Sequence, residues 1–110
     1  MSFQALLEEA KRFKALGDFG QAGEKLWGAA TMLIRLYAAA KGKTIRGWSL
    51  RGIERFITEE AEEEHKPLLR SLLDKAYPLR EAGLDEEAFS RRWGEAVRLI
   101  AEAGKIFPGE

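Results

Sequence analysis

The sequence has no cysteine and no asparagine, and it has a single histidine and three prolines among its 110 residues. Without cysteine, the chain forms no disulfide, no thiolate metal site and no cysteine nucleophile, which suits a reducing cytoplasm. No apolar run approaches the roughly 18 residues that a membrane-spanning helix needs. Residues 1–14 lack the basic-then-apolar order of a signal peptide. We therefore expect a cytoplasmic protein.

Net charge is also absent, because eighteen basic and eighteen acidic residues cancel. A balanced chain lacks the general attraction to phosphates of a dedicated nucleic-acid binder, although a local basic patch can still bind. Paired charges, few amides and no cysteine are typical of proteins from thermophiles. The length allows one hydrophobic core, so we expect a single domain over residues 1–110.

Apolar residues recur at helical spacing along most of the chain, and no segment alternates with period two. The fold class that this pattern predicts is all-α, an up-and-down bundle of four to five helices. We expect a break near His65–Lys66, a new helix opened by Pro67 and a kink at Tyr77–Pro78. The expected N-caps are Ser2, Asp18, Ser49 and Asp85, and the expected stops are Gly17, Gly42 and Gly83.

The segment 18–41 is apolar over more than half of the circumference of its expected helix. A first stripe contains Phe19, Ala22, Leu26, Ala29, Leu33, Leu36 and Ala40. A second stripe, roughly 100° further round, contains Gly23, Trp27, Ala30, Ile34 and Ala38. Such a helix is either central in a bundle or half of a dimer seam. The second stripe is therefore a candidate interface with a second copy or another partner, and the alternative is intrachain core.

A basic patch follows this helix, at Lys43, Arg46, Trp48 and Arg51. Basic side chains beside an aromatic ring can hold phosphates and stack on a base, so the patch is a candidate nucleotide or nucleic-acid site. The alternative is a charged loop in which Trp48 packs on Ile53 as a hydrophobic staple.

The other candidate motifs lack the residues or the spacing that their chemistry requires. Gly42-Lys43-Thr44 would belong to a phosphate-binding loop only with glycine at position 37, which is Tyr37. The glutamates of 59–64 spread around a helix instead of converging on a metal, and His65 has no histidine or cysteine partner. No serine stands beside a plausible base. We expect no catalytic residue, no metal and no cofactor.

Several short motifs together resemble the archaeal PaREP family, within the wider HEPN group of helical proteins. They are Gly17-Asp18 followed by Ala22, Lys25-Leu26-Trp27 and Ala29-Ala30, and the later segment LREAGLDEEAFSRRWGEAVRLI. The resemblance extends over residues from about 4 to 104 in helix order and spacing. A TPR-like hairpin shares the Gly-Asp-Phe motif and the spaced alanines, but one repeat of about 34 residues leaves the remaining helices unexplained.

The resemblance implies a helical bundle that forms a homodimer. It also implies one of two roles: pairing with a small nucleotidyltransferase in a toxin–antitoxin-like module, or metal-independent ribonuclease activity. The nuclease motif is Arg-x(4–6)-His, whereas nine residues separate Arg55 from His65 here. Arg70 precedes Tyr77 at the right spacing, but a phenol with a pKa of about 10 is a poor base.

We therefore expect a non-catalytic protein that acts through protein–protein interaction. Nucleotide or RNA binding through the basic patch is the alternative, and ribonuclease action by Arg70 and Tyr77 is a third candidate.

Overall fold

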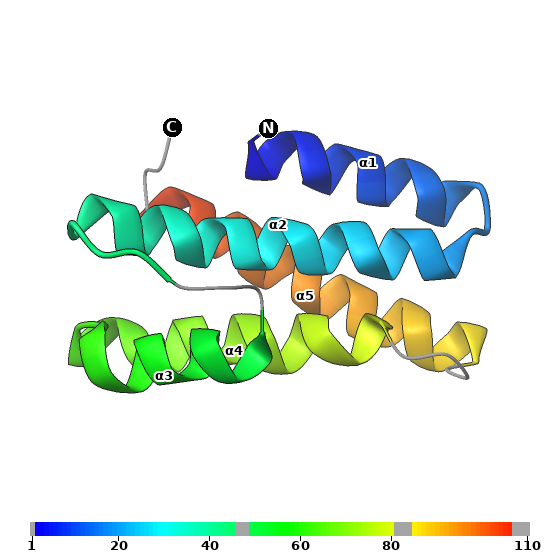
Figure 1. Ribbon diagram of the computed structural model, residues 1–110. Coiled ribbons are helices and arrows are strands. Elements are labelled where there is room, and N and C mark those ends of the chain that lie inside the picture. The colour runs from blue at the N-terminus through cyan, green and yellow to red at the C-terminus, as the bar shows by residue number, and fades with distance from the viewer. Residues whose placement is uncertain (1, 46–48, 81–84, 107–110) are drawn as a thin grey trace.

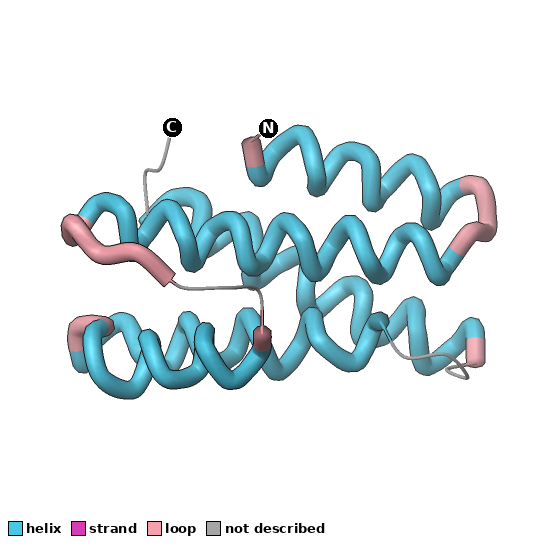
Figure 2. The backbone as a smooth tube through the Cα atoms, in the orientation of Figure 1, coloured by secondary structure: helices cyan, strands magenta, loops and turns pink. Residues whose placement is uncertain are grey.

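The computed structural model describes residues 2–45, 49–80 and 85–106, and in these ranges the chain is helical without any strand (Figures 1 and 2). The elements are α1 (Phe3–Ala15), α2 (Phe19–Ala40), α3 (Leu50–Glu60), the 3-10 helix η1 (Glu63–His65), α4 (Lys66–Ala76), the 3-10 helix η2 (Tyr77–Arg80) and α5 (Glu86–Ile106). The prediction of an all-α bundle is confirmed. None of the described helices has the length and apolarity that a membrane span requires.

The four predicted N-caps are all made. The Ser2 and Ser49 hydroxyls and the Asp18 and Asp85 carboxylates each accept a hydrogen bond from a backbone N–H three residues later. Gly17 stops α1 with a φ of 81°, a left-handed conformation that glycine adopts at little cost. The Asp18 N–H reaches back to the Phe13 carbonyl at 2.9 Å. This turn closes α1 and α2 into an antiparallel hairpin.

The helices run in alternating directions except α3, which runs in the same direction as α2 (Figure 1). Beyond the connection that follows α2, helix α3 begins back along the molecule, so the carboxyl ends of α2 and α3 lie together. Ion pairs between these ends join Lys43 to Glu60 and Lys41 to Glu62. Ile45, which lies in this connection, is buried in the core. Its carbonyl accepts a 3.0 Å hydrogen bond from Arg35 Nη1.

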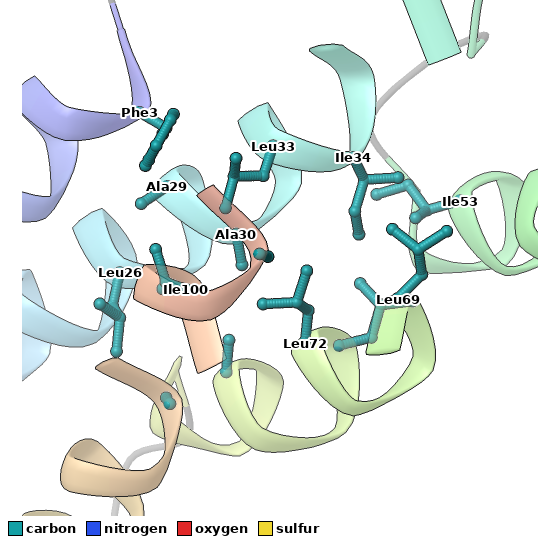
Figure 3. Close-up of a cluster of buried hydrophobic side chains, with 14 of the residues drawn as sticks. Phe3, Leu26, Ala29, Ala30, Leu33, Ile34, Ile53, Leu69, Leu72 and Ile100 are labelled. Carbon is teal, nitrogen blue, oxygen red and sulfur yellow. The ribbon is translucent and has the colours of Figure 1, made fainter. Parts of the chain in front are cut away.

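Helix α2 is the central element, with α1, α4, α5 and η2 packed around it. The second stripe is covered by this chain itself: Gly23, Ala30, Ile34 and Ala38 are buried, and Trp27 is partly buried. Ile34 is fully buried beside Ile53 and Leu69 (Figure 3). Of the two alternatives, an interface or intrachain core, the burial of these residues shows that the stripe is intrachain core. The expectation that it forms a dimer seam is corrected, because the helices of the same chain already occupy it.

The break after α3 comes earlier than the sequence predicts. Helix α3 ends at Glu60, and Ala61 and Glu62 are extended, with ψ angles of 151° and 143°. Ala61 is buried against the core, and the Glu62 N–H donates to the Tyr37 hydroxyl on α2 at 3.0 Å. A tertiary contact therefore stops a segment whose residues favour helix. A helix boundary does lie at the predicted His65–Lys66 position, where η1 gives way to α4, but α3 ends more than one turn earlier.

The second half of the chain follows the remaining predictions. Pro67 lies in the first turn of α4, and α4 gives way to the 3-10 helix η2 at Tyr77, next to Pro78. The proline ring permits this tighter turn but removes a donor from a continued α-helix. The predicted stop at Gly83 lies outside the described residues.

Candidate functional site

The two described residues of the predicted basic patch, Lys43 and Arg51, lie toward opposite ends of α3. Lys43 Nζ lies 3.2 Å from Glu60 Oε1, at the carboxyl end of α3. Arg51 is exposed in the first turn of the same helix, and nine residues at 1.5 Å each place it about 13 Å along the axis from Glu60. Arg46 and Trp48 lie outside the described residues.

Tyr37, Lys41, Glu62 and His65 form a polar cluster where α2 meets the α3–α4 connection, and we name it the Tyr37 cluster. His65 Nδ1 lies 2.9 Å from the Tyr37 hydroxyl oxygen and 3.5 Å from a Glu62 carboxylate oxygen. The other Glu62 oxygen lies 2.7 Å from Lys41 Nζ. The Lys41 ammonium also stands 5.6 Å from the centre of the Tyr37 ring.

His65 is therefore not the solvated histidine that its charged neighbours in the sequence indicate. Its side chain is 25% exposed, and its ring meets the Tyr37 ring edge-on at 5.3 Å. The Tyr37 hydroxyl can donate to an Nδ1 without a proton or accept from an Nδ1 that has one. The sequence predicts one helix through residues 59–64, which would point their side chains in different directions. Helix α3 instead ends at Glu60.

The electrostatics of the Tyr37 cluster favour the charged forms of its ion pair. The hydrogen bond from Lys41, and then its positive charge, lower the pKa of Glu62 below its ordinary value. The same hydrogen bond raises the pKa of Lys41. Each partner is thus held ionised by the other. The arrangement fastens the end of α2 to the turn between α3 and α4.

One trio in the described residues has the composition of a metal site. Potential ligand atoms of Glu62, Glu64 and His65 all lie within 4.8 Å of one another. Both glutamates are exposed, Lys41 already offsets the charge of Glu62, and His65 Nδ1 is engaged by Tyr37. We assign no metal to this trio, and the expectation of none stays a prediction.

A groove between α3 and α4 is the most promising binding surface, and we name it the α3–α4 groove. It consists of two adjoining hollows of about 140 and 150 Å³ that share Glu54, Leu73 and Asp74. The first is completed by Ile57, Thr58 and Arg70, and the second by Leu50, Tyr77 and Pro78.

The groove has an apolar floor and a polar rim. Ile57 and Leu73 are 0% and 3% exposed and form its base. At the rim, Arg70 Nη2 lies 3.4 Å from Thr58 Oγ1. Glu54 and Asp74 are both exposed, and no cation of the described residues lies within ion-pair distance of either carboxylate.

Arg70 and Tyr77, the pair with nuclease-like spacing, face the same groove but line different hollows. The Tyr77 ring packs edge-on against Trp27 at 5.1 Å, and the Arg80 guanidinium lies 5.1 Å from its centre. Tyr77 is thus held by aromatic and cation–π contacts, in which it acts as a packing residue.

Comparison with protein families identifies the family of this chain. A model of the archaeal PaREP1/PaREP8 family matches residues 1–103. No curated protein and no solved structure matches the chain. The match covers nearly the whole sequence and includes every described element from α1 to most of α5. This chain belongs to the archaeal PaREP1/PaREP8 family.

Proposed function

We propose that this chain is a HEPN-like helical bundle that acts without catalysis, through protein–protein interaction. The observation that carries the proposal is the α3–α4 groove, whose apolar floor and two rim carboxylates without an ion pair among the described residues suit a partner's side chains. The polar groups best able to do chemistry, Tyr37, His65 and Glu62, are bonded to one another instead. The HEPN grouping is supported by the all-α helix order and by the sequence resemblance.

The partners that we propose are a second copy of the chain and a small nucleotidyltransferase, in the cytoplasm. Because the second stripe of α2 is covered within the chain, a homodimer would form through another face. Size-exclusion chromatography with light scattering tests the homodimer, for which we expect twice the chain mass at micromolar concentration. Co-purification with a small archaeal nucleotidyltransferase tests the second partner.

A photo-crosslinking amino acid at Thr58 tests whether the α3–α4 groove is the contact surface. Thr58 is exposed on the groove rim, and Ser90, exposed on α5, provides a matched control position. We expect crosslinks to the nucleotidyltransferase or to a second copy from position 58 and none from position 90. A strictly monomeric chain that crosslinks to neither protein would overturn the proposal.

Nucleotide or RNA binding is the second candidate, because Arg51 and Arg55 are exposed and have no ion pair among the described residues. The ion pairs of Lys41 and Lys43 weaken it. Binding to single-stranded RNA should fall steeply with salt and be lost in a Lys43→Ala/Arg51→Ala variant. Salt-independent binding, or binding unchanged in this variant, would exclude the patch.

Ribonuclease action through Arg70 and Tyr77 is the least supported candidate. Incubation of the pure protein with RNA should leave the RNA intact. Cleavage that disappears in an Arg70→Ala variant would establish an activity that our proposal excludes.

A further inference from the structure

We propose that the α3–α4 groove receives a positively charged side chain, an arginine or a lysine, from its partner. This inference rests on the proposed function and specifies the chemistry of the partner. The relevant place is the hollow of about 150 Å³ beside Tyr77. Its lining combines two carboxylates, Glu54 and Asp74, with four residues that offer apolar surface: Leu50, Leu73, Tyr77 and Pro78.

The two charged side chains of this hollow are both acidic. Glu54 projects from α3 and Asp74 from α4, and neither has an ion pair within 4 Å among the described residues. Asp74 stands four residues after Arg70, the usual spacing for a helical ion pair. Arg70 instead reaches Thr58 in the adjoining hollow. Both carboxylates are left for an external cation.

The apolar lining selects among cations. Arginine and lysine carry aliphatic stems that cover apolar surface while the charged head group reaches a carboxylate. Leu73 lies at the base, with Leu50 and Pro78 beside it, so a stem can contact them while the head group meets Glu54 and Asp74. A small hydrated cation would leave this apolar surface uncovered.

Two other occupants fit less well. A purely apolar side chain would remove water from two carboxylates without supplying a partner, which is costly. A nucleic-acid backbone would bring phosphates toward two carboxylates of the same sign. Charge complementarity therefore favours a basic protein segment.

Three peptides that differ at one position test the inference with the full-length chain. The host is a nine-residue alanine-rich peptide whose central residue is arginine, citrulline or norleucine. Citrulline preserves the shape of arginine without its charge. We expect the arginine peptide to perturb the backbone amide NMR signals of Glu54, Leu73 and Asp74, and to bind more weakly as salt increases. The citrulline and norleucine peptides should cause little change.

The charge-neutral variant Glu54→Gln/Asp74→Asn should lower the affinity for the arginine peptide about fivefold, as expected for the loss of two exposed ion pairs. Glu102→Gln, an exposed glutamate on α5, is the matched control and should leave the affinity unchanged. Circular dichroism confirms that each variant is folded. Unchanged binding in the double variant, or perturbation spread evenly over the surface carboxylates, would overturn the inference.

The outcomes also separate this inference from the proposed function. Equal perturbation of the groove by norleucine and arginine would overturn the cationic specificity while the groove remains a protein-binding surface. Perturbation by none of the three peptides would overturn the cationic inference as well. In both cases, crosslinking from Thr58 to a protein partner would leave the proposed function standing.

Discussion

At the scale of single residues, Gly23 shows how closely α2 approaches η2. A Cβ added at this position would overlap the backbone carbonyl oxygen of Leu79, which cannot move as a flexible side chain can. Gly28 differs, because its added Cβ would make ordinary contacts with the Leu6 side chain, 3.6 Å away. Of these two glycines in α2, only Gly23 is required by a close backbone approach.

We expect Gly23→Ala to lower the free energy of unfolding by about 1–3 kcal/mol, because the added methyl group forces α2 and η2 apart. Gly94→Ala is the matched control. Gly94 lies in α5, and an added Cβ there meets nothing within 4 Å. The control should gain about 1 kcal/mol from its higher helix propensity. Urea denaturation measures both, and equal effects in the two variants would contradict the close-approach explanation.

Tyr37 is the second residue whose role depends on the fold. Its hydroxyl accepts a hydrogen bond from the Glu62 N–H and contacts His65 Nδ1, so it stabilises the extended residues that separate α3 from η1. Tyr37 is 6% exposed, and its ring packs edge-on against Phe56. Substitution by phenylalanine keeps the ring and removes only the polar contacts.

Tyr37→Phe should therefore cost about 1–2 kcal/mol in the free energy of unfolding, because the Glu62 N–H loses its acceptor. Tyr77→Phe is the control, since the described residues give the Tyr77 hydroxyl no hydrogen bond. Thermal unfolding followed by circular dichroism compares the two. Similar losses would show that the hydroxyl of Tyr37 has no special role.

At the scale of elements, ion pairs between neighbouring segments make stability depend on pH. Glu62 and Glu95 pair with Lys41 and Lys75, which join α2 to the α3–η1 turn and α4 to α5. In each case the hydrogen bond from the lysine, and then its charge, lower the glutamate pKa from its ordinary value of 4.5. The contribution of these groups is small, because the side chains are exposed.

A lowered folded-state pKa means that the pair stabilises the fold above about pH 4.5 and that this stabilisation is lost as the pH falls through the folded pKa. The raised pKa of Lys41 has the opposite sign: its contribution is present below about pH 10.5 and is lost as the pH rises through the folded pKa. We expect the melting temperature to fall on acidification below pH 4.5. A Glu62→Gln/Glu95→Gln variant should show a shallower fall than the parent chain, and an identical slope would contradict this assignment.

The element boundaries show where local signals suffice. Ser2, Asp18, Ser49 and Asp85 cap their helices as predicted, because each cap is a contact within three residues of itself. The end of α3 was missed, because its cause is a hydroxyl from α2, 25 residues away in the sequence. The predicted staple residue Trp48 lies outside the described ranges.

At the scale of the whole molecule, α2 is the central helix, so a substitution in its second stripe tests whether that stripe is core. Ile34 is fully buried in the chain, so a charge there would be buried without a partner. Ile34→Asp should lower the free energy of unfolding by at least about 3 kcal/mol and reduce helical circular dichroism. If the stripe were a dimer seam, the same variant would stay folded and become monomeric.

The matched control for this prediction is Leu16→Asp. Leu16 is 72% exposed after α1, and a charge there remains in water. Its melting temperature should stay close to that of the parent chain. A folded, monomeric Ile34→Asp protein with the stability of this control would restore the seam.

The candidate site was less predictable than the fold. The sequence places Glu54, Ile57 and Thr58 on one helix and Arg70, Leu73 and Asp74 on another at helical spacing, but it does not state that these two faces adjoin. Lys43 and Arg51 are near neighbours in the sequence, yet the first pairs with Glu60 at the far end of α3. Sequence proximity across a loop is a poor guide to spatial proximity.

The sequence by itself determined the helical class, the four N-caps, the stops at Gly17 and Gly42 and the places of Pro67 and Pro78, because these depend on periodicity and on contacts within one turn. It also carried the resemblance to the archaeal PaREP family, which the match over residues 1–103 confirms. Only the tertiary structure decided that the second stripe of α2 is core, that Tyr37 contacts the extended residues after α3, and that α3 and α4 line a groove. Those outcomes depend on which helices meet, and helices with similar apolar stripes can pack in several arrangements that local spacing does not distinguish.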